Sequence, residues 1–264
     1  MTEGSPLAYR IDGQGEALLL LNGGMMTIAS WEAIAAPLAE RYRVVRCDFR
    51  GQLRSPGTPY SDLAGHVADL VALLDELGIE RVHAVGTSFG AEVGLLLAAL
   101  HPERVVSLVA AAATDVATPA LRDGRGVLQQ ECRNAAAGHN RDRLLEEMQG
   151  FFYSPAYVAA HRQELAERAV QIAKLPDWWF AGAAEILASL ENLDLRHYLA
   201  SITCPVLVLA ASEDRVMLLE HARTLASAIP AARLEVVEGS GHVLVVEQPE
   251  RFARSCLDFL ASVH

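Results

Sequence analysis

A serine on a glycine-flanked turn is the clearest chemical signal in the sequence. Ser88 lies at the centre of Gly86-Thr87-Ser88-Phe89-Gly90, which joins an apolar run to a helical pattern. A serine on such a strand-to-helix turn is held in a strained backbone conformation that lifts its hydroxyl clear of the chain. Because Gly-x-Ser-x-Gly is also common in ordinary turns, this candidate nucleophile needs partners elsewhere in the chain.

A serine nucleophile needs a base, and the base needs a carboxylate that orients it. Asp214 and His242 each follow a late apolar run, and glycines flank the segment that carries the histidine. We therefore predict His242 as the base and Asp214 as its carboxylate. Glu213 and Asp115 stay open as alternative carboxylates, because both also lie behind an apolar run.

The elements that must position these residues alternate between strand and helix patterns. Strands are predicted for residues 7–11, 17–21, 42–47, 81–85, 105–113, 205–211 and 233–237. Helical spacing of apolar residues covers residues 31–38, 67–74, 93–100, 217–228 and 249–262. The turn Asp12-Gly13-Gln14-Gly15 suggests that the first two strands form an opening hairpin. The later alternation predicts an α/β fold with a mostly parallel sheet.

Residues 115–198 differ from the rest of the chain in their pattern of apolar residues. They contain no strand-like run, and their helical patterns carry bulky aromatic residues. These are Phe151, Phe152, Tyr153, Tyr157, Trp178, Trp179 and Phe180. We interpret the segment as a helical cap inserted into one core, which then comprises residues 1–114 and 199–264.

Taken together, the motifs resemble those of the α/β-hydrolase superfamily over nearly all of the chain outside the insertion. The order Ser, Asp, His is the one this superfamily uses. Asp48-Phe49-Arg50-Gly51 after an early strand and Glu247-Gln248-Pro249 after the histidine add to the resemblance. It implies a mostly parallel, eight-stranded sheet flanked by helices. It also implies that Ser88 is the nucleophile on a nucleophile elbow, His242 the general base and then acid, and Asp214 the residue that holds the imidazole tautomer.

The resemblance further implies an oxyanion hole built from two backbone N–H donors. One is the amide of Phe89, directly after the nucleophile. The other is expected in the loop Asn22-Gly23-Gly24, where superfamily members often have His-Gly-x. Counting back from Trp31, which resembles a recurrent tryptophan of such enzymes, assigns this donor to Gly24, with Met25 as the alternative.

The loop Arg50-Gly51-Gln52-Leu53-Arg54-Ser55 departs from the superfamily pattern, in which glycine often replaces Leu53. We expect the loop to be structural. Asp48 and Arg50 are predicted to form an ion pair that fixes it, so neither is assigned a catalytic role.

A serine nucleophile favours acyl transfer over the epoxide and halide chemistry of relatives that use aspartate. We therefore predict a serine hydrolase that cleaves a carboxylic ester or lactone through an acyl-enzyme. Trp178, Trp179 and Phe180 are predicted to wall an apolar pocket, which suggests a small apolar substrate; packing of the cap against the core is an equally open interpretation.

Three other functions stay open on the same fold. Asn22-Gly23-Gly24-Met25 loosely resembles the corresponding loop of bacterial acyltransferases that build rhamnolipid precursors, so an acyltransferase is one of them. A C–C bond hydrolase and a ligand sensor with slow hydrolysis are the others.

Composition and charge limit the partners and the location. The net charge of −11 and the scattered arginines disfavour nucleic acid. No apolar run approaches the ~18 residues of a membrane-spanning helix, and Met1-Thr2-Glu3-Gly4 does not resemble a secretion signal. We expect a cytoplasmic protein without membrane insertion, of unspecified oligomeric state.

Cysteine usage indicates neither a metal site nor a redox motif. The chain has four cysteines without a C-x-x-C pair, namely Cys47, Cys132, Cys204 and Cys256. We predict that they are buried free thiols, and we expect no metal and no cofactor.

Overall fold

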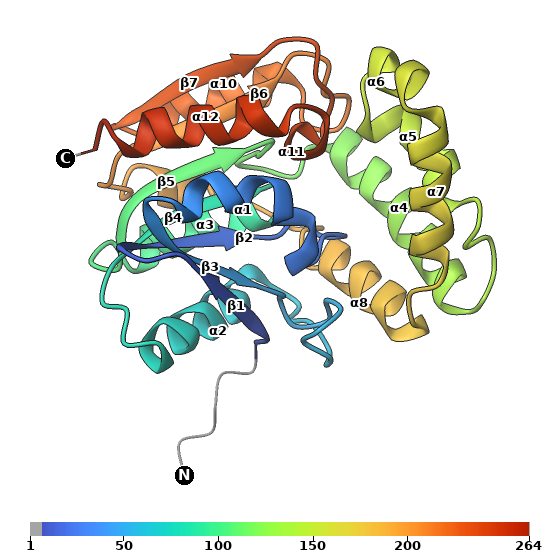
Figure 1. Cartoon of the computed structure of the whole chain (residues 1–264), viewed down its shortest axis with the longest axis horizontal. Helices are drawn as coiled ribbons and strands as arrows, with labels where there is room; N and C mark the ends of the chain where they lie inside the picture. The colour runs from blue at the N-terminus through green and yellow to red at the C-terminus, as the bar shows by residue number, and fades with distance from the viewer. Residues whose placement is uncertain (1–6, 264) are drawn as a thin grey trace.

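A seven-stranded sheet forms the centre of the molecule (Figure 1). The computed structural model describes residues 7–263, so the expectation about Met1-Thr2-Glu3-Gly4 lies outside the described residues. The strand order is β1-β3-β2-β4-β5-β6-β7, and every pair except β1–β3 is parallel. Helices cover both faces of the sheet (Figure 1), which confirms the predicted α/β fold.

The strands and helices follow one another closely along the chain. The strands are β1 (Tyr9–Asp12), β2 (Glu16–Leu21), β3 (Tyr42–Cys47), β4 (Val82–Thr87), β5 (Val105–Ala111), β6 (Val206–Ala211) and β7 (Ala232–Val237). The helices of the core are η1 (Ile28–Trp31), α1 (Glu32–Ala39), α2 (Leu63–Glu76), α3 (Phe89–Leu100), α9 (Arg196–Leu199), α10 (Leu219–Ala228), α11 (Leu244–Glu247) and α12 (Pro249–Leu260). The helices between β5 and α9 are α4 (Pro119–Ala136), α5 (Leu144–Phe152), α6 (Pro155–Ala160), α7 (Arg162–Ala173) and α8 (Asp177–Ala188).

Two expectations about the sheet are wrong. β1 and β2 do not form a hairpin, because β3 lies between them, antiparallel to β1 and parallel to β2. β2 is buried on both faces from Leu18 to Leu21 and needs a partner on each side, whereas β1 exposes Tyr9 and Arg10 and suits the edge. The sheet has seven strands and not eight within residues 7–263, because only the seven predicted apolar runs pair into it.

Two hydrophobic cores lie on opposite faces of the sheet. In β2, Leu19 and Leu21 belong to the core under α2 and α3, and Leu18 and Leu20 to the core under α1 and α12. This is the alternation that a strand imposes on its side chains. Because both faces are filled, the carboxyl ends of the parallel strands are the part of the sheet where loops can build a site.

The helices α4 to α8 form an insertion between β5 and β6, at the right of the sheet in Figure 1. Its two ends meet at an antiparallel bridge between Val116 and Asp194. A Cβ atom on Gly182 of α8 would collide with the carbonyl oxygen of Gly51. The insertion therefore starts and ends at one point of the core, and α8 lies directly on the loop after β3.

The loop after β3 is fixed by Asp48, without the predicted ion pair to Arg50. The buried Asp48 carboxylate accepts hydrogen bonds from the Ile28 backbone N–H at 2.6 Å and from the Asn22 side chain at 3.0 Å. Arg50 instead pairs with Asp69 of α2, at 3.1 Å. The ion-pair prediction is wrong because neutral donors, most of them in the segment after β2, already satisfy the buried carboxylate.

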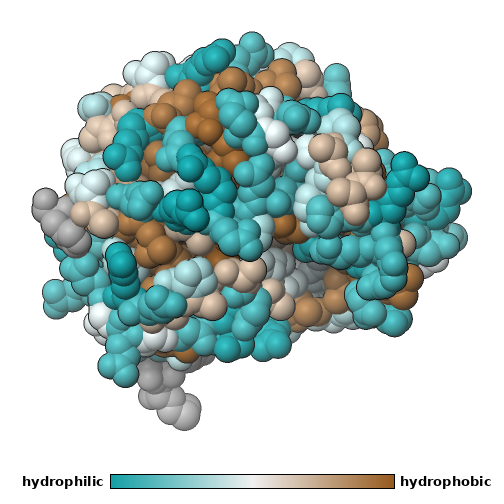
Figure 2. Space-filling model, turned by 45° about the horizontal axis from the view of Figure 1, so that its top comes forward, coloured by the Kyte–Doolittle hydropathy of each residue, from teal (hydrophilic) through white to brown (hydrophobic). Residues whose placement is uncertain are grey.

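The four cysteines are buried and free, as predicted. Within residues 7–263, none of the helices combines the length and the apolar character needed to cross a membrane. The face shown in Figure 2 carries mainly hydrophilic residues, and hydrophobic side chains appear on it in separate smaller areas.

A buried histidine makes the stability of the core dependent on pH. The ring of His66 is fully buried and packs edge-to-face against Phe49, Tyr60 and Phe89. Burial lowers the pKa of His66 to about 4, an effect that the nearby Asp69 carboxylate only partly opposes. The neutral ring therefore stabilises the fold fully above the ordinary histidine pKa of about 6.5, and this stabilisation is lost as the pH falls toward 4.

We predict that the free energy of unfolding attributable to His66 falls by about 2 kcal/mol between pH 7 and pH 5. Urea denaturation at the two pH values should show a smaller loss for His66→Phe than for the wild type. The exposed His197 provides the control, and His197→Gln should keep the wild-type loss. An equal loss in wild type and His66→Phe would contradict the prediction.

Candidate active site

Ser88 lies on a sharp turn between β4 and α3. Its φ of 51° and ψ of −124° belong to a backbone region that residues with a Cβ rarely adopt. A Cβ on Gly86 would come within 2.5 Å of the Gly90 carbonyl oxygen, and one on Gly90 would collide with the carbonyl of Leu21. Glycine at both positions lets α3 start immediately behind the strand, which presents the serine hydroxyl at the carboxyl edge of the sheet.

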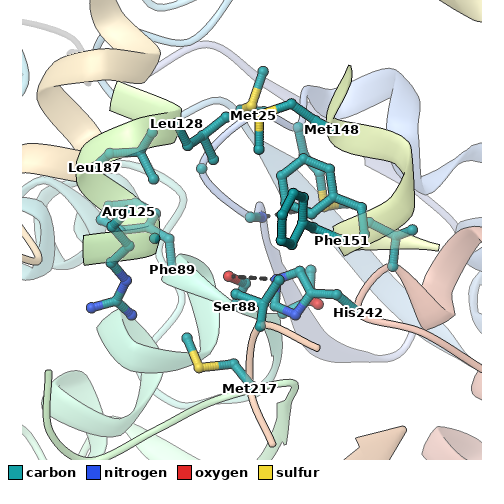
Figure 3. Close-up of a pocket in the computed structure, with 18 of the residues that line it drawn as sticks. Met25, Ser88, Phe89, Arg125, Leu128, Met148, Phe151, Leu187, Met217 and His242 are labelled. Atoms are coloured by element: carbon teal, nitrogen blue, oxygen red, sulfur yellow. Dashed lines mark hydrogen bonds between the residues drawn. The ribbon is translucent and has the colours of Figure 1, made fainter. Parts of the chain in front are cut away.

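Ser88, His242 and Asp214 form a continuous hydrogen-bonded chain. The His242 Nε2 atom lies 3.2 Å from the Ser88 Oγ atom (Figure 3), and the Nδ1 atom lies 2.9 Å from the Asp214 Oδ2 atom. A carboxylate at Nδ1 favours the tautomer that is protonated there, and Nε2 is then left to accept the serine proton. The arrangement can deprotonate the hydroxyl and hold the resulting imidazolium beside a negative charge.

Asp214 is the carboxylate that contacts His242. It is buried, and its Oδ1 atom accepts hydrogen bonds from two backbone N–H groups of the following loop at 2.8 Å each. Glu213 is exposed. The backbone carbonyl of Asp115 accepts from the Leu195 N–H at the base of the insertion. The structure thus brings Asp214, and neither alternative, into hydrogen-bond contact with the imidazole.

Backbone N–H groups of Gly24, Met25 and Phe89 are available at the same place. None of the three donates a hydrogen bond to an acceptor among residues 7–263. All three residues line the cavity that Ser88 also lines. Unsatisfied donors at the edge of a cavity are suited to bind the oxyanion of a tetrahedral intermediate, and both Gly24 and Met25 stay candidates for the second donor.

Asn22 holds the loop between β2 and η1 in place. Its side-chain NH2 donates to Asp48 at 3.0 Å and to Gln52 at 2.8 Å, and its Oδ1 atom accepts from the Trp31 indole N–H at 2.7 Å. Gln52 in turn donates to the Gly23 carbonyl oxygen at 2.8 Å. Asparagine, which stands where the resemblance expects histidine, anchors the loop by being donor and acceptor at once. Gln52 was not predicted, because its partners lie about 30 residues away in the sequence.

A cavity of about 400 Å³ opens above Ser88. Figure 3 labels apolar residues of its walls, which are Met25, Phe89, Leu128, Met148, Phe151, Leu187 and Met217. Of the three aromatic residues predicted to wall a pocket, Trp179 lines this cavity. Trp178 is 39% exposed and Phe180 packs edge-to-face on Trp179, so these two residues are not part of the lining.

The insertion also supports the loop that carries His242. Phe152 stacks on the imidazole, with ring centroids 6.1 Å apart. Glu247 accepts a hydrogen bond from the Ser154 hydroxyl at 2.6 Å and another from the Gly241 N–H at 2.9 Å. Aromatic character was the one sequence signal that pointed to Phe152. Ser154 carried no signal, because its partner lies 93 positions away.

A buried ion pair joins α3 to α4 next to the site. Glu92 lies one helical turn after Ser88, is fully buried, and accepts a hydrogen bond from the Arg125 guanidinium at 2.9 Å. Arg125 also donates to the Leu190 carbonyl oxygen at 3.2 Å. Burial raises the pKa of the Glu92 carboxyl, and the positive charge of Arg125 opposes that shift. This pair could not be predicted from the sequence, because each partner alone is typical of a solvated helix residue.

Comparison with known proteins shows to which family this chain is related. The family model described as "alpha/beta hydrolase fold" matches residues 16–249. A protein of Variovorax paradoxus (strain S110) named "Putative carbamate hydrolase RutD" is 33% identical, covering 98% of this chain and 97% of that protein. The "3-oxoadipate enol-lactonase 1" of Acinetobacter baylyi (strain ATCC 33305 / BD413 / ADP1) is 28% identical, covering 99% and 95%. The crystal structure of the enol-lactonase from Burkholderia xenovorans LB400 superposes with a TM-score of 0.83 at 26% identity, covering 97% of this chain and 96% of that one. The chain therefore belongs to the α/β-hydrolase fold family.

Proposed function

We propose that this protein is a serine hydrolase that cleaves a carboxylic ester or a lactone through an acyl-enzyme. The observation that supports the proposal most directly is the hydrogen-bonded chain from Ser88 through His242 to Asp214 at the floor of an apolar cavity. Similarity to proteins named as enol-lactonases supports a substrate in which an acyl carbon bears an oxygen leaving group.

In the proposed reaction, Ser88 Oγ attacks the carbonyl carbon while its proton passes to His242 Nε2. The Asp214 carboxylate stabilises the imidazolium that forms, and the N–H of Phe89 with that of Gly24 or Met25 binds the oxyanion. Collapse of the tetrahedral intermediate breaks the bond to the leaving oxygen, which takes the proton from the imidazolium. Water then repeats the sequence on the acyl-enzyme, and the acid product leaves.

The helical segment 115–198 is proposed to act as the cap of this site, on a core of residues 1–114 and 199–264. Its helices supply Leu128, Met148 and Phe151 to the cavity wall. A cavity of about 400 Å³ lies at the lower end of the size range typical of small-molecule sites. A small substrate with an apolar part fits these walls.

A substrate panel tests the proposal. It comprises p-nitrophenyl esters of increasing acyl length, a p-nitrophenyl carbamate, γ-butyrolactone and N-acyl homoserine lactones. We expect turnover of at least one ester or lactone, and we expect a fluorophosphonate to modify one residue, found by mass spectrometry in the peptide that contains Ser88. Absence of both turnover and modification would contradict the proposal.

The same panel distinguishes the other functions. A ligand-dependent rise in melting temperature without turnover would favour a sensor, and ester formation with an added hydroxy acid would favour an acyltransferase. Cleavage of a β-diketone without ester turnover would favour C–C bond hydrolysis. Turnover of the carbamate alone would move the substrate toward the chemistry named for the Variovorax relative.

A further inference from the structure

The cavity above Ser88 is lined by three arginines and, among the described residues, by no acidic side chain. The arginines are Arg125, Arg168 and Arg215. The chain as a whole has a net charge of −11, so this distribution is opposite in sign to that of the protein. Charged groups in an otherwise apolar pocket are costly unless they meet a partner of opposite charge. The partners of each arginine therefore decide whether its charge is available to a ligand.

Arg125 is already neutralised inside the protein. Its guanidinium pairs with the buried Glu92 at 2.9 Å and donates to the Leu190 carbonyl oxygen. Figure 3 shows this guanidinium pointing away from Ser88 and His242. Arg125 thus contributes packing and a structural ion pair, and its charge is not available to a ligand.

Arg168 and Arg215 have no such partner. Arg168 comes from α7 and is half-buried, yet no carboxylate among residues 7–263 lies within 4 Å of its guanidinium, and it donates no hydrogen bond to a described residue. Arg215 follows Asp214 in the core, is exposed at the rim of the cavity, and donates to the backbone carbonyl of Gly150 at 3.1 Å, again without a carboxylate partner in the described part of the chain. One guanidinium from the insertion and one from the core therefore border the cavity without a direct ion pair to a described residue.

Tyr153 is a cavity residue that relates to both arginines. Tyr153 is buried and lines the cavity, and it lines a second, smaller groove together with Arg215. The positive charge of Arg168 acts on the Tyr153 hydroxyl, where it opposes the rise in pKa that burial causes and to which the carboxylates of Glu247 and Glu164 add. Arg168 and Arg215 are therefore both associated with the part of the cavity that Tyr153 borders.

We propose that Arg168 and Arg215 bind a carboxylate of the substrate, so that the natural substrate is an anionic ester or lactone with a short apolar body. The inference rests on the proposed function and adds the charge of the substrate to it. A guanidinium presents parallel N–H donors that match a carboxylate in a bidentate arrangement. Such a contact would orient the scissile carbonyl over Ser88, while Met148 and Phe151 cover the apolar body.

Two pairs of matched esters test the charge of the substrate. The first pair compares the mono-p-nitrophenyl ester of glutaric acid with the same compound whose free carboxyl is methylated. The second places the charge on the leaving group and compares 4-carboxyphenyl butanoate with its methyl ester. We expect kcat/KM to favour the carboxylate by about 10- to 100-fold in at least one pair, mainly through KM.

Substitutions locate the preference. Arg168→Gln and Arg215→Gln should each remove most of it, lowering kcat/KM for the charged esters far more than for their neutral partners, whereas Arg168→Lys should retain part of the preference. Arg162 is the matched control, because it lies on the same helix α7 and lines only the second groove, not the main cavity that contains Ser88. Arg162→Gln should behave as the wild type does with all four esters.

A binding measurement makes the test independent of turnover. Glutarate should bind the wild type at least about tenfold more tightly than glutaramide in calorimetry, and Arg168→Gln should abolish the difference. The inference is overturned if both ester pairs and both ligands show no preference for the carboxylate, or if Arg162→Gln changes the preference as Arg168→Gln does. Turnover of the neutral esters with the modification at Ser88 would still support hydrolysis, so the two proposals fail separately.

Discussion

Replacing Ser88 with alanine is expected to lower kcat for the proposed ester hydrolysis by about 10⁴- to 10⁶-fold, the size of the loss seen when a serine hydrolase is deprived of its nucleophile. No other hydroxyl is placed within hydrogen-bond distance of the His242 Nε2 atom in the described part of the chain. The variant therefore has no group in place to form the proposed acyl-enzyme. The remaining activity comes from the oxyanion donors and from substrate binding alone.

The fold should tolerate this change. The turn is set by the close approach of Gly86 and Gly90 and not by the serine hydroxyl, so the melting temperature should stay near that of the wild type. Rates with the best substrate of the panel and a thermal melt check the two expectations. Ser227→Ala, on the exposed side of α10, is the control and should keep full activity. Wild-type turnover by Ser88→Ala would exclude Ser88 as the nucleophile.

Replacing Arg125 with methionine lowers the free energy of unfolding by about 3–5 kcal/mol. The change leaves the Glu92 carboxylate buried without its counter-charge, and removing one partner of a buried pair is far more costly than removing both. Glu92 must then either lose its charge or draw water into the interface between α3 and α4. The loss should be smaller at acidic pH, where Glu92 is neutralised by protonation.

Urea denaturation of a double-mutant cycle measures this effect. Glu92→Leu with Arg125→Met should recover much of the stability that Arg125→Met loses, because no unpaired charge is left. Arg133 of α4 and Glu185 of α8 form a comparison pair within the insertion. Their charged atoms lie 3.6 Å apart, and both side chains are about half exposed. Arg133→Met should therefore cost no more than about 1 kcal/mol. Equal losses for Arg125→Met and Arg133→Met would show that the buried pair contributes no more to the free energy of unfolding than the exposed pair does.

The sequence predicted the strands well but not their order in space. All seven predicted runs became strands. For an inner strand such as β6, this follows because a strand buried on both faces has to be continuously apolar. Which strand pairs with which depends on the burial of each whole strand. Tyr9 and Arg10 place β1 at the edge beyond β3, and the local turn signal between β1 and β2 carried no information about this.

The residues of the proposed site likewise comprise some that the sequence could predict and some that it could not. Ser88, Asp214 and His242 could be predicted because parallel strands bring their carboxyl ends to one edge, so that residues after β4, β6 and β7 meet whatever the intervening chain does. Side chains of the insertion could not be placed from the sequence. Trp179 lines the cavity while its neighbours Trp178 and Phe180 do not, and only the rotation of α8 decides this.

By itself, therefore, the sequence determined the α/β fold and indicated Ser88 and His242, with Asp214 as the first of three candidate carboxylates, since turn chemistry and strand periodicity are local properties. The tertiary structure decided the pairing of β1, the ion pair between Glu92 and Arg125, and the position of Arg168 and Arg215 at the cavity without a carboxylate partner among residues 7–263. These features join segments far apart in the chain. A charged residue looks alike in the sequence whether water, a buried carboxylate or a ligand is its partner, and only packing selects among the three.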